Sequence, residues 1–163
     1  MSRPVCMLLD TNVWLDAFLP ERIPRSSARR LISMALRQNV TLLYPIHIVP
    51  DVFYLSFIDV KRLLKGKGAD EVVASAARST AWEYVNTMRE IATAVGADQA
   101  DVWLACKQEF LHDDMEDNLV LAAMSRSGAD YLVTSDKKLL AHAPLASVAA
   151  VFPDDMIRVL EQL

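Results

Sequence analysis

Short apolar runs alternate along the chain with longer segments in which apolar residues recur every three or four positions. Such uninterrupted apolar runs are typical of strands that are buried on both faces of a parallel sheet. The predicted strands are residues 5–9, 40–44, 92–95, 131–133 and 148–151.

The longer segments have the spacing of amphipathic helices. Ser26 or Ser27 is the expected N-cap of one helix, and Gly128 suits the C-cap of another. The predicted helices are residues 13–18, 26–37, 51–64, 69–89, 98–109 and 116–125, with a closing helix that begins near Pro153.

Alternating strands and helices predict an α/β fold, in which one mostly parallel sheet of four to five strands is covered by helices on both faces. The chain has 163 residues, of which 53% are hydrophobic and 23% are charged. This length and composition are those of one globular domain. We therefore expect residues 1–163 to form a single domain with three layers.

Several protein classes are disfavoured by missing patterns. No apolar run reaches the roughly 18 residues of a membrane span, and no signal-peptide core precedes Asp10. The two cysteines have neither zinc-ligand nor disulfide-framework spacing, which predicts a reduced, cytoplasmic protein. There is also no Walker loop, GxGxxG or GxSxG motif, which argues against P-loop, dinucleotide and serine-hydrolase chemistry.

The net charge of −4 is unevenly distributed. Residues 22–67 include nine basic and two acidic residues, whereas residues 69–163 include seven basic and sixteen acidic ones. A phosphate backbone responds to local potential rather than to net charge, so a nucleic-acid partner remains compatible with this composition. Ordinary solvated helix faces explain the basic segment equally well.

Two aspartates follow predicted strands. Asp10 ends the first strand, and Asp136 lies just after residues 131–133. Ligands of open α/β sheets bind beyond the carboxyl ends of the strands, so these two acids should be neighbours. Like charges held close together are costly, and a hard divalent cation resolves that cost.

Asp117 and Asp51 add two further acids, each near the start of a predicted helix. Either one alone is explained by the favourable interaction of a carboxylate with a helix N-terminus. The case for a metal site therefore depends on the combination of Asp10, Asp51, Asp117 and Asp136.

Two parts of the sequence resemble a known family. The segment LLDTNV at residues 8–13 resembles the opening signature of PIN-domain nucleases. The segments DMEDNL at 114–119 and GADYLVTSD at 128–136 resemble the second half of that family, in the same order and at a similar separation. The resemblance covers nearly the whole chain.

This resemblance implies a PIN fold with acids gathered around one or two Mg²⁺ or Mn²⁺ ions. Asp10 matches the first-strand aspartate of the family, Asp117 its helix aspartate and Asp136 the aspartate after the fourth strand. The family usually has glutamate where this chain has Asp51. Aspartate is one methylene shorter, so Asp51 is expected to reach a metal less directly, or through water.

Other polar residues in these motifs have candidate supporting roles. Thr11 and Asn12 are placed to orient Asp10 or a phosphate, although Asn12 also suits a helix cap. Ser135 has the same two readings beside Asp136. Asp114 would share a helix face with Asp117, which allows either an outer metal role or an acidic cap.

The expected reaction is hydrolysis of an RNA phosphodiester by metal-activated water, on a single-stranded or looped RNA. The basic segment, with Lys137 and Lys138, would hold the RNA backbone. Within the family, a chain of this length resembles the VapC-type toxins of toxin–antitoxin pairs. That resemblance implies a small antitoxin partner and a homodimer.

Two alternatives remain open at this stage. The first is a catalytically weak PIN module that binds RNA or a protein partner without cleavage, and the aspartate at position 51 favours it. The second is an α/β phosphohydrolase that uses Asp10 as a covalent nucleophile. Such enzymes commonly need a second aspartate two residues on, and Asn12 occupies that position.

Overall fold

A five-stranded parallel sheet forms the centre of the computed structural model, which describes residues 4–22 and 25–162. The strand order is β3-β2-β1-β4-β5, and each neighbouring pair is parallel. The strands are β1 (Cys6–Leu9), β2 (Thr41–Pro45), β3 (Thr93–Val95), β4 (Tyr131–Val133) and β5 (Ala150–Val151). The predicted parallel α/β sheet is thereby confirmed.

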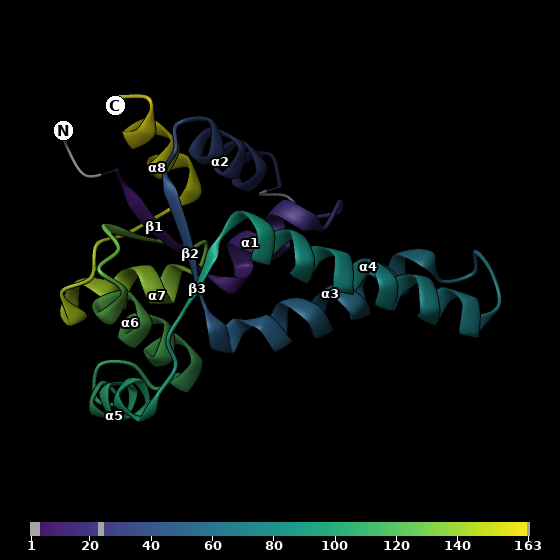
Figure 1. The fold of residues 1–163 in the computed structure, drawn as a ribbon. Helices are drawn as coiled ribbons and strands as arrows, with labels where there is room; N and C mark the ends of the chain where they lie inside the picture. Colours follow the sequence, from purple (N-terminus) through teal and green to yellow (C-terminus); the bar gives the residue numbers. More distant parts are fainter. Residues whose placement is uncertain (1–3, 23–24, 163) are drawn as a thin grey trace.

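Helices cover the two faces of this sheet (Figure 1). Right-handed crossovers place α1 to α4 on one face and α5 to α7 on the other, while α8 packs against α2. The helices are α1 (Thr11–Phe18), α2 (Arg25–Arg37), α3 (Val49–Leu64), α4 (Asp70–Ile91), α5 (Gln99–Lys107), α6 (Met115–Ser127), α7 (Lys137–His142) and α8 (Pro153–Leu160). Two short 3₁₀ helices, η1 (Ile46–Ile48) and η2 (Ala143–Ala146), precede α3 and follow α7.

The central strand β1 lies in the middle of the hydrophobic core. Met7, Leu8 and Leu9 are completely buried, as expected for an apolar strand covered on both sides. Leu8 is in register with Leu43 of β2 and Leu132 of β4. The ends of these three strands therefore stand side by side at one edge of the sheet.

Some predicted element boundaries are wrong. Helix α3 begins at Val49, two residues before Asp51, because η1 leads directly into it. Helix α2 begins at Arg25, so neither Ser26 nor Ser27 is its N-cap. The Ser27 hydroxyl instead donates to Asp154 of α8 at 2.7 Å. Gly128 does adopt the left-handed conformation of a C-cap after α6, as predicted.

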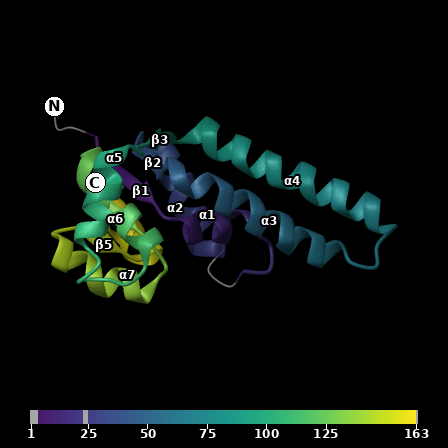
Figure 2. The same cartoon turned by 90° about the horizontal axis from the view of Figure 1, so that it is seen from below.

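Helices α3 and α4 pack against each other as a hairpin that extends away from the sheet (Figures 1 and 2). The hairpin exposes several large apolar side chains, namely Tyr54, Leu55, Ile58, Val72 and Trp82. Among the described residues, no helix is long and apolar enough to cross a membrane.

Candidate metal centre

Asp10 lies at the point where β1 ends and α1 begins. Its backbone N–H donates to the Val133 carbonyl of β4 at 3.0 Å, which connects the ends of the two central strands. Its Oδ1 accepts the Thr11 backbone N–H at 2.7 Å and thereby caps α1. The Asp10 side chain is nevertheless buried, with only 5% exposure.

Asn12 and Thr134 hold the other oxygen of Asp10. Asn12 Nδ2 and Thr134 Oγ1 each donate to Asp10 Oδ2 at 2.7 Å. Asn12 Oδ1 in turn accepts the Ser135 backbone N–H at 2.8 Å. Of the two readings of Asn12, the structure therefore favours the orienting one, since the residue lies inside α1 and Asp10 is the cap.

Thr11 and Ser135 bond to the Asp10–Asn12 pair through their backbones, and their side chains do not hydrogen-bond to the Asp10 carboxylate. The Thr11 hydroxyl is buried, with no hydrogen-bond partner in the described part of the chain. The Ser135 hydroxyl donates to Asp16 at 3.2 Å, and Asp16 forms an ion pair with Arg22 at 2.9 Å. Their backbone N–H groups, rather than their side chains, bond to the Asp10–Asn12 pair.

Asp136 follows β4 and is the N-cap of α7. Its Oδ1 accepts the backbone N–H groups of Lys138 at 2.7 Å and Leu139 at 3.1 Å. Its own backbone N–H donates to the Thr134 hydroxyl at 3.0 Å. Thr134 therefore contacts both Asp10 and Asp136 and sets their relative position.

Asp117 lies in the first turn of α6, where its side chain meets a histidine. Its Oδ2 is 2.6 Å from Nε2 of His112, which is itself buried. Asp114 is the N-cap of α6, because its Oδ1 accepts the backbone N–H groups of Glu116 and Asp117. Of the two readings of Asp114, the structure thus favours the cap.

Asp51 is the third residue of α3 and approaches the start of α6. Burial raises the pKa of Glu116, and the charges of Asp51 and Asp10 raise it further. Asp51 has no side-chain hydrogen bond within the described residues. Its charge acts on His47, because burial lowers the pKa of that histidine and the Asp51 charge opposes the lowering.

The acids also influence one another. Burial raises the pKa of Asp10 to about 6, against the hydrogen bonds from Thr134, Thr11 and Asn12, and the Asp117 charge adds to the rise. Burial likewise raises the pKa of Asp117, a rise that His112 opposes and the charge of Asp136 reinforces. Asp10, Asp117 and Asp136 therefore share one electrostatic environment.

The electrostatic interaction between these acids is distinct from an arrangement of side chains that could hold a metal ion. Among residues 4–22 and 25–162, no three His, Cys, Asp or Glu side chains stand close enough to hold one metal ion. The structure thus brings the predicted acids to one edge of the sheet as electrostatic neighbours, with their carboxylates still spread apart.

Comparison with known families decides how this edge is to be interpreted. A family model described as a PIN domain matches residues 7–138, which is most of the chain and spans all four acids. The chain belongs to the PIN-domain family. No curated protein matches it significantly. PIN domains are generally nucleases, typically use divalent metal ions and act on RNA.

Three residues of this PIN domain's acidic edge were not predicted as part of the site: Thr134, His112 and Glu116. Thr134 had a detectable signal, because it lies two residues before Asp136 at the end of a strand. Glu116 lies in the acidic first turn of α6, where a solvated acid is the ordinary expectation, although burial and the charges of Asp51 and Asp10 raise its pKa. His112 had no recognisable signal, since the turn between α5 and α6 determines where its ring lies.

The basic segment of the PIN domain is divided between several elements. Arg22, Arg30 and Arg62 form ion pairs within the fold, and the Arg29 side chain donates to the Ala17 carbonyl. Lys61 follows Asp51 by ten residues on α3, about 15 Å along the helix axis. This part of the basic segment therefore lies away from the acids.

Proposed function

We propose that this PIN domain is a Mg²⁺- or Mn²⁺-dependent endoribonuclease of the VapC-like toxin type. The observation that carries the proposal is the buried Asp10 carboxylate at the carboxyl edge of the PIN-domain sheet, where Thr134 bonds to both Asp10 and Asp136. An uncompensated group of acids at that edge favours a bound cation. We propose Asp10, Asp51, Asp117 and Asp136 as its ligands and as the catalytic residues.

The chemistry of the available donors fits such a cation. Mg²⁺ and Mn²⁺ prefer carboxylate oxygens and retain several waters. Asp136 Oδ2 and Asp117 Oδ1 have no hydrogen bond within the described residues, whereas the partner oxygen of each carboxylate is already held. Since the side chains do not yet converge, binding would require rotation of the less constrained acids, Asp51 foremost.

The chain's own residues have distinct proposed tasks in hydrolysis. Asn12 and Thr134 keep the Asp10 carboxylate in one orientation, and His112 does the same for Asp117. When bound, the metal would supply water of lowered pKa as the nucleophile. Thr11, Ser135 and Asp114 are proposed to support these residues through the backbone and the α6 cap.

The substrate is proposed to be single-stranded or looped RNA, because hydrolysis needs an accessible backbone. Lys137 and Lys138 are exposed at the start of α7, next to Asp136, and suit contact with phosphate. We also propose that residues 1–163 form one cytoplasmic domain, which acts as a homodimer with a small antitoxin.

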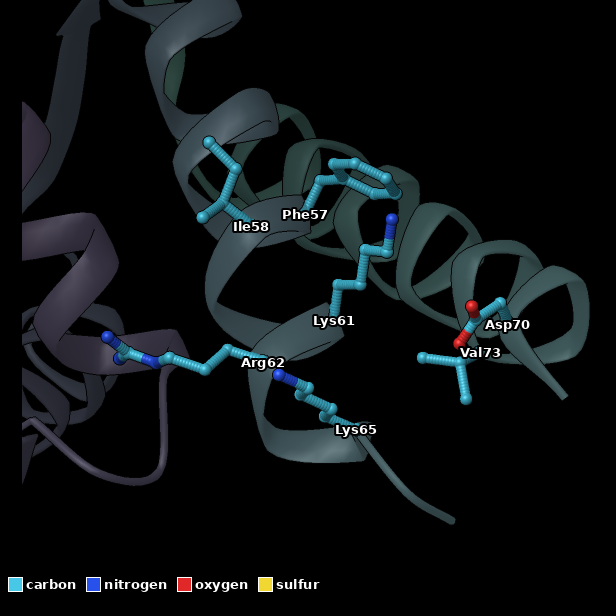
Figure 3. Close-up of a pocket in the computed structure, with 7 residues that line it drawn as sticks. All are labelled: Phe57, Ile58, Lys61, Arg62, Lys65, Asp70 and Val73. Atoms are coloured by element: carbon cyan, nitrogen blue, oxygen red, sulfur yellow. The ribbon is translucent and has the colours of Figure 1, made fainter. Parts of the chain in front are cut away.

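The α3–α4 hairpin is the proposed surface for the antitoxin. A pocket between the two helices has an apolar floor that includes Phe57, Ile58 and Val73 (Figure 3). Lys61, Arg62 and Lys65 stand along its α3 side in the same view. The pocket also contains one acid, Asp70, so three basic residues outnumber it. An apolar groove with this basic excess is complementary to an acidic amphipathic segment.

The decisive assay incubates the purified chain with labelled single-stranded RNA in Mg²⁺, Mn²⁺ or EDTA. Cleavage is expected with either metal and not in EDTA, and Asp10→Asn should reduce it by at least about 100-fold, because a charged ligand is lost. Asp155→Asn is the matched control, since Asp155 is a surface acid paired only with Arg158.

The outcomes of this assay distinguish the nuclease from the non-cleaving PIN module and from the phosphohydrolase. Metal-dependent cleavage that Asp10→Asn abolishes and Asp155→Asn preserves supports the nuclease. RNA binding without cleavage in any metal supports the non-cleaving PIN module, which the spread carboxylates and the short Asp51 side chain favour as the second candidate. A phosphoenzyme trapped at Asp10 would overturn both.

A further inference from the structure

A pocket of about 400 Å³ lies next to the acids, and two of its lining residues, His112 and Lys138, already have proposed tasks in hydrolysis. One wall is the turn after α5, which contributes Phe110 and His112. The other wall is α7, which contributes Lys138 and His142. Its volume is within the range of small-ligand sites.

Both walls contact the acidic edge directly. His112 Nε2 lies 2.6 Å from Asp117 Oδ2, and the Lys138 backbone N–H donates to Asp136 Oδ1 at 2.7 Å. Asp117 and Asp136 do not themselves line the pocket, so a ligand in it would be separated from them by His112 and by the start of α7. That position suits part of the substrate itself rather than a remote effector.

The side chains of the pocket suit a nucleotide. Phe110 is 84% exposed, so its ring is available for contact. The rings of His112 and His142 stack at 4.4 Å with an interplanar angle of 2°. His142 Nδ1 donates to the Lys138 carbonyl at 2.7 Å, which fixes the outer ring. Exposed aromatic rings beside a cationic side chain are the usual means of binding single-stranded nucleic acid.

The acidic residues of the pocket indicate which part of a nucleotide enters it. Glu109 and Asp113 also line the pocket, and the Asp113 side chain is fully exposed. Their carboxylates repel a phosphate group but accept hydrogen bonds from the amino groups of a base. The side of the pocket that carries these exposed carboxylates thus favours a base, with the phosphate directed toward Lys138.

We propose that this pocket holds one nucleotide of the RNA beside the scissile bond, with its base stacked on Phe110 and its phosphate contacted by Lys138. This inference rests on the proposed function, and it names a substrate-positioning site on this chain outside the four acids.

The test measures binding of fluorescein-labelled single-stranded RNA to the full chain by anisotropy in EDTA, where no divalent ion supports cleavage. Phe110→Ala should weaken Kd about tenfold, the order expected for losing one stacked base. Phe110→Tyr keeps the ring and should restore binding. Trp103→Ala is the control, because Trp103 is an exposed aromatic residue on α5 that does not line this pocket.

Each result has a defined meaning. Equal binding by the wild type and Phe110→Ala would contradict the proposed nucleotide pocket without contradicting the proposed nuclease activity. An equal loss of binding in Trp103→Ala would have the same meaning. If binding in EDTA is too weak to measure but Mg²⁺ or Mn²⁺ supports cleavage, the comparison is made on KM, which Phe110→Ala should raise about tenfold. A wild type that neither binds nor cleaves RNA overturns the proposed function itself.

Discussion

The Asp10 carboxylate is subject to two opposed influences. Hydrogen bonds from Thr134, Thr11 and Asn12 favour its ionised form, whereas burial and the Asp117 charge favour its protonated form. Burial prevails and raises the pKa to about 6 from an ordinary value of 3.8. At neutral pH the fold therefore maintains an ionised carboxylate at a cost in free energy.

This cost gives the free energy of unfolding a predictable pH dependence. Because the folded-state pKa of Asp10 is above its unfolded value, the folded chain binds more protons between pH 4 and pH 6. The stability contributed by this group is thus present below pH 4 and is lost as pH rises through about 6. Between pH 8 and pH 5, the wild type should gain roughly 1–2 kcal/mol relative to Asp10→Asn.

The measurement is urea unfolding of both proteins, in EDTA, at several pH values. Asparagine does not titrate, so Asp10→Asn removes only the Asp10 component from the pH profile. Asp155→Asn serves as the control, because Asp155 is a half-exposed acid at the surface. Parallel pH profiles for the wild type and Asp10→Asn would contradict the raised pKa.

For individual site residues, the sequence predicted the residue type and the position in the chain. It did not predict which side chains contact each other. Asp10 and Asp136 were located from the apolar runs that precede them. The proximity of His112 to Asp117 was not, because the intervening turn has no periodic pattern from which a ring orientation follows. The metal roles of the four acids remain predictions.

At the scale of elements, helix α6 depends on a single cap to position Asp117. Asp114 Oδ1 accepts two backbone N–H groups of the first turn, including that of Asp117 itself. Asp114→Ala should destabilise the chain by about 1 kcal/mol and loosen that turn. Asp114→Ser retains a capping oxygen and should recover most of the loss.

Two readouts check this prediction. Urea unfolding gives the loss of stability, and hydrogen exchange of the amides in residues 115–118 locates it to the first turn of α6. Because Asp117 moves with that turn, RNA cleavage should fall in Asp114→Ala and recover in Asp114→Ser. If serine and alanine variants behaved alike, the cap would not be what positions Asp117.

The elements themselves were largely predictable because their patterns are local. Apolar runs located the five strands, although β5 is shorter than expected, and helical spacing located the long helices. The start of α3 was wrong because a 3₁₀ turn has no distinctive apolar period. The predicted N-cap of α2 was wrong because the helix already begins at Arg25, and Ser27 instead bonds to Asp154 of α8, 127 positions away.

At the scale of the whole molecule, the α3–α4 hairpin begins near Asp51, extends away from the sheet (Figures 1 and 2) and leaves apolar side chains exposed. If it binds an acidic antitoxin segment, a negative charge there should weaken capture. Ile58 is 57% exposed and lines the groove. Ile58→Glu should weaken binding of the proposed antitoxin, to be sought as the product of a small neighbouring reading frame, at least about tenfold.

Co-expression of that neighbour with the wild type, followed by a binding titration, provides the measurement. Leu145→Glu is the matched control, because Leu145 is a similarly exposed apolar residue on η2. RNA cleavage by free Ile58→Glu should remain at the wild-type level, which separates the surface from the acids. Undiminished capture by Ile58→Glu, or the absence of any small neighbouring reading frame, would contradict the antitoxin assignment.

The sequence by itself determined the parallel α/β architecture and the positions of the four acids along the chain. It could do so because apolar periodicity and strand-end residues are local features. Only the tertiary structure decided that Thr134 links Asp10 to Asp136, that His112 meets Asp117, and that a pocket opens between the α5–α6 turn and α7. The Thr134–Asp10 contact joins residues 124 positions apart and so depends on the order of the strands. The His112–Asp117 contact and the pocket depend on how the α5–α6 turn packs.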